Sequence, residues 1–153
     1  MSGDNDLMKL YSQRILALAA EVPHNARLES PMASVKKRSP LCGSTVTVDI
    51  DVKDGKISNY GAEIKACALG QAAAGVVGQA AVGRTQAQII TARDQLKAML
   101  KEDGPAPEAP FDGLEALLPA KDYKNRHASI MLTLDALAQA FDDAQADPAD
   151  QTA

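Results

Sequence analysis

The chain has 153 residues, of which 46% are hydrophobic, and this size is typical of one compact domain with its own core. Aromatic residues make up only 3% and tryptophan is absent, which argues against a large aromatic pocket for a bulky organic cofactor. The net charge of -4 argues against nucleic acid as a partner, because binding to the phosphate backbone usually requires a basic surface.

The first residues predict one amphipathic helix followed by an extended segment. Apolar residues recur at helical spacing over 4–22, and Pro23 ends this helix. Residues 23–41 are rich in proline and serine, so we expect an extended loop there, with an additional strand as the alternative. The basic run 36–38 is expected to be a solvated patch, with docking to an acidic partner as the functional alternative.

Residues 45–66 carry the clearest strand pattern of the chain. Valine and isoleucine alternate with threonine and aspartate over 45–52, Asp54–Gly55 favours a turn, and the chain returns over 57–66. We therefore expect an antiparallel hairpin over about 45–66. A three-residue turn at 53–55 is preferred to a two-residue turn, because the latter would place the apolar residues of the first strand opposite polar or small ones.

The second half of the chain predicts helices only. Its first segment is rich in alanine and glycine, which permits close approach of another backbone. Thr85 and Gln88 then have the spacing of a capping box at the start of the next helix. The expected helices cover residues 67–82, 85–102, 111–118 and 123–144.

A helix, a hairpin and then a block of helices predict an α+β fold, in which a small antiparallel sheet packs against helices. We expect a single domain over 1–145 and a disordered acidic tail over 146–153, which is poor in hydrophobic residues. The chain begins without a basic and then apolar stretch, and no segment has the length of an uncharged membrane span. These features predict a cytoplasmic protein.

Cys42 and Cys67 flank the hairpin and are the only cysteines of the chain. If the strand pairing continues to the ends of the hairpin, either turn places the two cysteines directly opposite each other or one residue away from that. Their Cβ atoms are then expected roughly 5–8 Å apart, which lets both bind one metal. Cys67 is at the start of a helix, which favours a thiolate, and basic residues precede Cys42. The alternative is that each cysteine is a small buried core residue.

The two histidines differ in their expected roles. His24 is in a polar segment and is expected to be solvated. His127 is near the start of the last expected helix, and if this helix start lies over the hairpin end, its imidazole could bind iron or zinc. We therefore include His127 with the two cysteines as a candidate metal ligand.

Short motifs in the chain resemble those of the iron–sulfur cluster assembly scaffolds of the IscU, NifU N-terminal and SufU family. The sequence Pro40-Leu41-Cys42-Gly43 resembles the P-x-C-G-D motif, and Cys67 begins a small-residue helix as the family's second cysteine does. The resemblance covers about residues 7–141. It also includes Leu10-Tyr11, which is similar to the family's L-Y, His24-Asn25-Ala26-Arg27, which is similar to N-P-R-N, and 126–132, which resembles the helix start with the third cysteine.

Two positions depart from the family pattern. Ser44 stands where the family has the aspartate of C-G-D, a carboxylate that the family links to cluster handling and release. The third cysteine is also missing. An alignment without a gap puts Ser129 in its place and is preferred, whereas matching His127 to the family's histidine puts Ala128 there. A serine hydroxyl is a poor iron ligand beside a thiolate, so neither alignment replaces the lost sulfur.

The resemblance implies a scaffold or carrier that holds iron or an iron–sulfur cluster through Cys42 and Cys67, with zinc as an alternative metal. Two subunits would have to share one cluster to provide four thiolates. The implied partners are a cysteine desulfurase and cluster-recipient proteins, and the chain is not expected to be an enzyme itself. Two alternatives remain open: a SufE-like sulfur acceptor that takes persulfide on Cys42, and a structural or interaction module without cluster chemistry.

Overall fold

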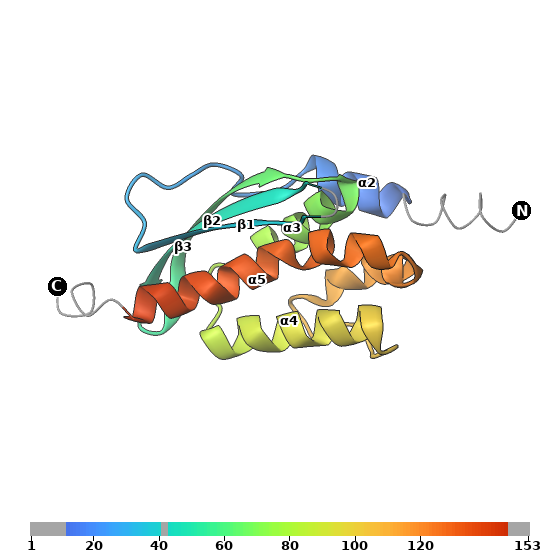
Figure 1. The fold of residues 1–153 in the computed structure, drawn as a ribbon. Coiled ribbons are helices and arrows are strands. Elements are labelled where there is room, and N and C mark those ends of the chain that lie inside the picture. Colours follow the sequence, from blue (N-terminus) through green and yellow to red (C-terminus); the bar gives the residue numbers. More distant parts are fainter. Residues whose placement is uncertain (1–11, 41–42, 147–153) are drawn as a thin grey trace, which may run out of the picture.

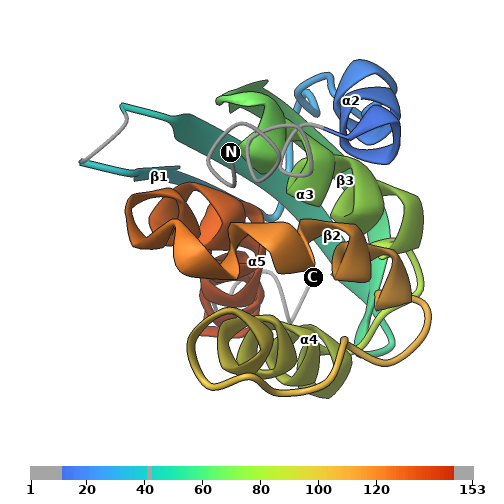
Figure 2. The same cartoon turned by 90° about the vertical axis from the view of Figure 1, so that its right-hand side faces the viewer.

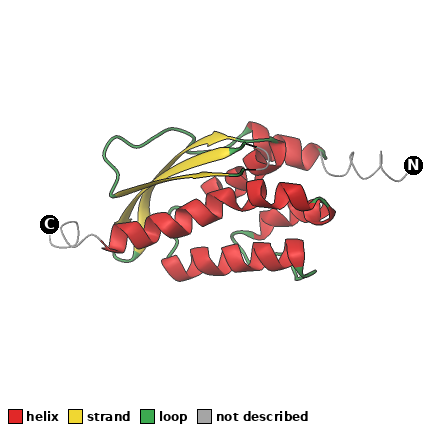
Figure 3. Cartoon of the chain, viewed as in Figure 1, coloured by secondary structure: helices red, strands yellow, loops and turns green. Residues whose placement is uncertain are grey.

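The computed structural model describes residues 12–40 and 43–146. Strands β1 (Ala33–Arg38), β2 (Thr45–Lys53) and β3 (Lys56–Lys65) form an antiparallel sheet in the order β1-β2-β3 (Figure 3). The helices are α2 (Gln13–Ala20), α3 (Ala68–Ala80), α4 (Gln86–Lys101), the 3-10 helix η1 (Asp112–Asp122) and α5 (Lys124–Ala146). The predicted α+β class is confirmed. Residues 4–11 of the first expected helix and 147–153 of the expected tail lie outside the described residues.

Helices α3, α5 and α4 pack in two levels beneath one face of the sheet. Helix α5 lies under β1 and β2 and beside α3, and α4 packs on the side of α5 away from the sheet (Figures 1 and 2). Apolar side chains of the sheet, α3 and α5 form the core between the first two layers, including Val48, Leu69 and Leu134. None of the helices in the described part of the chain is long and apolar enough to cross a membrane.

The other face of the sheet is covered by the segment between α2 and β1, which arches over it (Figure 1). Gly61 of β3 lies so close to Ala26 O that a Cβ atom at this position would collide with the carbonyl. Arg27 donates a hydrogen bond from Nε to Asp49 Oδ2 at 2.6 Å, and the Leu28 N–H donates to the same oxygen at 3.0 Å. The fully buried Asp49 thus fastens this segment to the centre of the sheet.

The hairpin has a two-residue turn and a bulge, so the preferred three-residue turn was wrong. Asp54 and Gly55 form the turn with φ of 56° and 77°, and Val52 pairs with Ile57. One extra residue of β3, Ser58, then shifts the pairing. The shift brings Val46, Val48 and Ile50 opposite Ile64, Ala62 and Tyr60, so the apolar residues of both strands share one face as expected.

Residues 33–38 form the edge strand β1, which corrects the expectation of an extended loop and supports its alternative. Ala33 and Val35 are buried against α5, whereas Ser34 and Lys36 between and after them are exposed. This alternation is the usual pattern of a strand with one buried face. The alternation is short, and the basic run 36–38 within the strand obscures it in the sequence.

The helical half agrees closely with its expected boundaries. Thr85 and Gln88 form both hydrogen bonds of a capping box at the start of α4. In α3, a Cβ atom on Gly75 would lie 2.6 Å from Leu18 O, so the glycine allows α2 to approach α3 at backbone distance. The expected helix over 111–118 is the 3-10 helix η1, which leads directly into α5.

Candidate functional site

Cys67 is the N-cap residue of α3, at the point where the chain leaves β3. Its backbone is extended, with φ of -67° and ψ of 171°, and its carbonyl accepts the first helical hydrogen bond from Gln71 N at 2.9 Å. The Gln71 side chain donates to Ala66 O at 2.8 Å and fixes the link between strand and helix. The residue is half-buried and lies at the N-terminal, positive end of the α3 dipole, which favours negatively charged groups nearby.

Ser129 connects the beginning of α5 to Cys67. Its Oγ lies 3.6 Å from Cys67 Sγ and donates a hydrogen bond to Ser44 Oγ at 3.0 Å. Both serines are buried, with 1% and 3% of their surface exposed. Gly70 makes room for this contact, because a Cβ atom there would lie 2.6 Å from Ser129 Oγ. The starts of α3, α5 and β2 therefore meet at one point.

Cys42 lies outside the described residues, so its expected distance from Cys67 stays a prediction. The described residues before and after it, Ser39, Gly43 and Ser44, are linked by backbone hydrogen bonds. Ser39 N donates to Ser44 O at 2.8 Å, and Gly43 N donates to Ser39 O at 2.9 Å. Because Ser44 also contacts Ser129, these described residues lie next to the Cys67 site.

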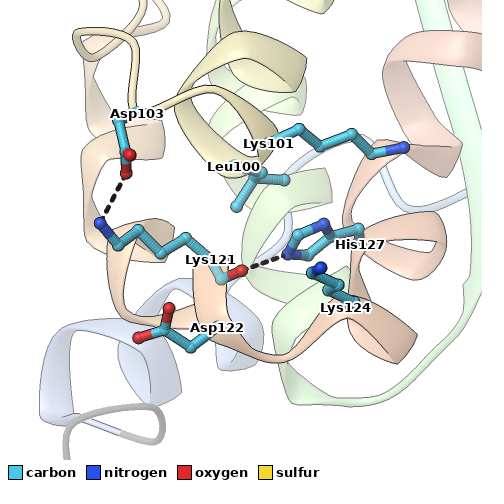
Figure 4. Close-up of a pocket in the computed structure, with 7 residues that line it drawn as sticks. All are labelled: Leu100, Lys101, Asp103, Lys121, Asp122, Lys124 and His127. Atoms are coloured by element: carbon cyan, nitrogen blue, oxygen red, sulfur yellow. Dashed lines mark hydrogen bonds and ion pairs between the residues drawn. The ribbon is translucent and has the colours of Figure 1, made fainter.

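The structure does not bring His127 to this site. Its ring is buried between η1 and α5, and Nε2 lies 3.0 Å from both Ala120 O and Lys121 O (Figure 4). A carbonyl oxygen can only accept, so Nε2 has a proton and is not free to bind a metal. Residues two apart on a helix point about 200° apart, which separates His127 from Ser129. Its ligand role stays a prediction, and its place between η1 and α5, away from Cys67, argues against a shared site with the cysteines.

The same geometry distinguishes the two alignments of the missing cysteine. Ser129 contacts Cys67, whereas Ala128 is exposed and lines a groove beside α4. Position 129 is therefore the position that faces the cysteine site. Among the described residues, no group of three or more histidine, cysteine or acidic side chains could hold a metal, and zinc has no support here. The Ser44–Ser129 hydrogen bond was not predicted, although both positions had been identified as departures from the family pattern.

No protein-family model and no curated protein matches the chain. Among solved structures, the N-terminal part of a nitrogen-fixing NifU-like protein from Brucella abortus matches with a TM-score of 0.89 and 41% sequence identity. The match covers 92% of this chain and 97% of that one. The chain belongs to the IscU/NifU/SufU family. The identity extends over nearly the whole of both chains, so membership rests on the complete fold and not only on the short motifs.

Two further structures share the fold at lower identity. A suggested iron–sulfur cluster assembly scaffold protein of the SUF system from Fervidobacterium islandicum matches with a TM-score of 0.79 and 19% identity, covering 88% of this chain and 98% of that one. A hypothetical protein matches with a TM-score of 0.78 and 17% identity, over 88% and 98% of the two chains. At these identities the likeness concerns the fold alone.

Proposed function

We propose that this chain is an iron–sulfur cluster assembly scaffold or carrier that holds its cargo through Cys42 and Cys67. The observation that carries the proposal is the contact between Cys67 and Ser129 at 3.6 Å, at the meeting point of three elements. It gives this family member a half-buried thiol at a helix start, in contact with Ser129, which is bonded to Ser44, two residues after Cys42 in the sequence. Cysteine thiolates are the usual ligands of such clusters.

The ligand set of one subunit is small. The hydroxyls of Ser44 and Ser129 are bonded to each other and are weak ligands for iron beside thiolates, so only the two cysteines count. A cluster usually requires four protein ligands, and two subunits that share one cluster would provide them. The proposal therefore includes a homodimer in the loaded state. A cysteine desulfurase as sulfur donor and recipient proteins for the cluster are the partners it requires.

Anaerobic reconstitution with iron and sulfide tests the proposal, with iron and acid-labile sulfide measured on the purified protein. Cys42→Ala and Cys67→Ala should each abolish cluster binding, because a two-thiolate site cannot lose either sulfur. Ser129→Ala is the matched control, since it removes a buried hydroxyl near the same thiol and should leave cluster content unchanged. Wild-type amounts of iron and sulfide in either cysteine variant would refute the proposal.

A second candidate function is that of a sulfur acceptor for a cysteine desulfurase. The hydrogen bond between Ser44 and Ser129 favours this function, because it occupies both hydroxyls at the Cys67 site. A sulfur acceptor requires a single thiol and no further ligands, so this arrangement is sufficient for it. The Cys42 thiolate would attack the outer sulfur of the donor's persulfide and release the donor's thiolate, leaving a persulfide on Cys42. Mass spectrometry after incubation with a desulfurase and cysteine would show 32 Da added on Cys42, a gain of about one sulfur atom. If Cys67→Ala still gains this mass, and neither the wild type nor this variant binds a cluster, the chain is a sulfur acceptor.

A further inference from the structure

A basic groove runs between α4 and α5, on the side of α5 opposite the cysteine site. It has a volume of about 470 Å³ and is lined by four cations and two carboxylates, together with His127, Ala128 and Met131. The charged residues are Arg93, Lys97, Lys101, Lys124, Asp94 and Asp135. The groove is thus positive in a chain whose net charge is -4. We call it the α4–α5 groove.

The groove continues at one end into a second hollow of about 490 Å³ (Figure 4). Lys101, Lys124 and His127 line both hollows. Lys121 and Asp103 form an ion pair of 2.7 Å at the edge of the second one. The open cationic part is therefore the first hollow, from Arg93 to the junction at Lys101.

Most cations of the α4–α5 groove have no partner in the described part of the chain. Lys97, Lys101 and Lys124 are exposed and form no ion pair or side-chain hydrogen bond there, and Arg93 contacts only its neighbour Asp94, at 3.4 Å. Asp135 lies half-buried in the groove wall. Burial raises its pKa, and the nearby cations only partly offset this effect. Even with both carboxylates ionised, the four cations leave the groove with a net positive charge.

The cations are arranged in a row. Arg93, Lys97 and Lys101 are four residues apart on α4, which corresponds to about 6 Å per step along the helix axis. Alternate residues of an extended chain are about 6.6 Å apart, so their carboxylates could meet successive cations. A single phosphate group would require donors that converge on one point. We propose that the α4–α5 groove binds an extended acidic segment of a partner protein, with carboxylates at alternate positions.

This docking surface is independent of the cysteine site. Ala128 lines the α4–α5 groove, whereas the next residue, Ser129, is buried against Cys67 on the other side of α5. A partner segment in the groove would leave the thiol accessible. The proposal can therefore fail while the scaffold function holds, and its test requires no cluster.

Fluorescence anisotropy of the metal-free full chain tests the proposal, using a labelled eight-residue peptide of alternating glutamate and alanine. The triple variant Arg93→Gln, Lys97→Gln, Lys101→Gln should weaken binding by about tenfold or more, since each exposed ion pair contributes little alone. The matched control Lys53→Gln, Lys56→Gln, Lys65→Gln removes the same charge from the exposed hairpin and should bind as wild type. Circular dichroism verifies that both triple variants are folded.

Four further arms complete the test. Asp135→Asn should strengthen binding of the peptide, because it removes a like charge from the groove wall. Equal weakening in the hairpin control, or equal binding of a peptide with glutamine in place of glutamate, would overturn the proposal. If inorganic phosphate below about 1 mM displaces the peptide, the groove is a small-anion site instead. If the double variant Asp147→Asn, Asp150→Asn binds the peptide more tightly than wild type, the chain's own acidic end occupies the groove.

Discussion

At the scale of single residues, position 129 sets how many sulfur ligands the cysteine site can offer. The Ser129 hydroxyl already lies 3.6 Å from Cys67 Sγ, so a cysteine at position 129 would add a third thiolate to the chain, next to that of Cys67. We expect Ser129→Cys to raise affinity for iron or the cluster by about tenfold or more, because a soft charged ligand replaces a neutral hydroxyl. Titration of the metal-free protein with iron under anaerobic conditions measures this.

The control for that experiment is Ala128→Cys, one residue away. Ala128 is exposed in the α4–α5 groove, so a cysteine there should leave iron affinity unchanged. If Ala128→Cys strengthens binding and Ser129→Cys does not, the alignment that matches His127 to the family's histidine is correct and the site differs from the one described.

Asp49 gives a prediction about stability and pH. Burial, the largest influence, raises its pKa, but hydrogen bonds from Arg27, Ser34 and the Leu28 N–H, together with the charge of Arg27, outweigh it and hold the pKa below its usual range. The ionised form thus stabilises the fold above the unfolded-state pKa near 4, and this contribution disappears as pH falls through the lower folded-state pKa. Asp49→Asn should lower the free energy of unfolding by about 1.5–3 kcal/mol at pH 7.

Urea unfolding of wild type and Asp49→Asn at pH 7 and pH 3 measures this effect. The difference between the two proteins should shrink at pH 3, which lies below the unfolded-state pKa near 4, because the unfolded chain then binds a proton at Asp49 more readily than the folded one does. Glu63→Gln serves as the control, because Glu63 is exposed and its loss should change stability little at either pH. A difference of the same size at both pH values would contradict the role of the Asp49 charge.

At the scale of elements, α3 depends on small residues to pack against its neighbours. Gly75 should not tolerate a methyl group, because a Cβ atom would lie 2.6 Å from the backbone oxygen of Leu18. Gly75→Ala gains about 1 kcal/mol of helix propensity, yet we expect a net loss of about 1–3 kcal/mol from the collision. Thermal and urea unfolding check this, with the exposed Gln79→Ala as control, and a variant as stable as wild type would contradict the close approach of α2 and α3.

The elements themselves could largely be predicted, because their signals are local. The alternation over 45–66 gave the hairpin, and the capping box at Thr85 gave the start of α4. The register could not be predicted, since the bulge at Ser58 follows from matching the apolar faces in three dimensions. The edge strand β1 was obscured because only Ala33 and Val35 carry its buried pattern.

The candidate site was predictable to a similar degree. The position of Cys67 at a helix start followed from the order of the predicted elements, and that of Ser129 beside it followed from the resemblance to the family. The direction of the His127 ring did not, because the carbonyls that bind it belong to η1, whose packing no local pattern shows. Side-chain direction on a helix depends on its neighbours, and the sequence alone does not specify them.

At the scale of the whole molecule, α5 separates two surfaces with different chemistry. One side of its first turns faces Cys67 and the turn between β1 and β2, and the other side forms the wall of the α4–α5 groove. This arrangement would let a partner dock on the basic groove while the thiols remain free for cargo. It also leaves the cysteine site at an end of the sheet, where a second copy of the chain could complete the ligand set.

The central claim is that two chains hold one cluster between Cys42 and Cys67 of each. The most direct test is to reconstitute the wild type anaerobically and measure iron, sulfide and molar mass in solution on the same sample. A shared two-iron cluster predicts about one iron and one sulfide per chain and the mass of two chains. Iron and sulfide no higher than in a Cys42→Ala, Cys67→Ala double variant would contradict the claim, as would a cluster bound to a single chain.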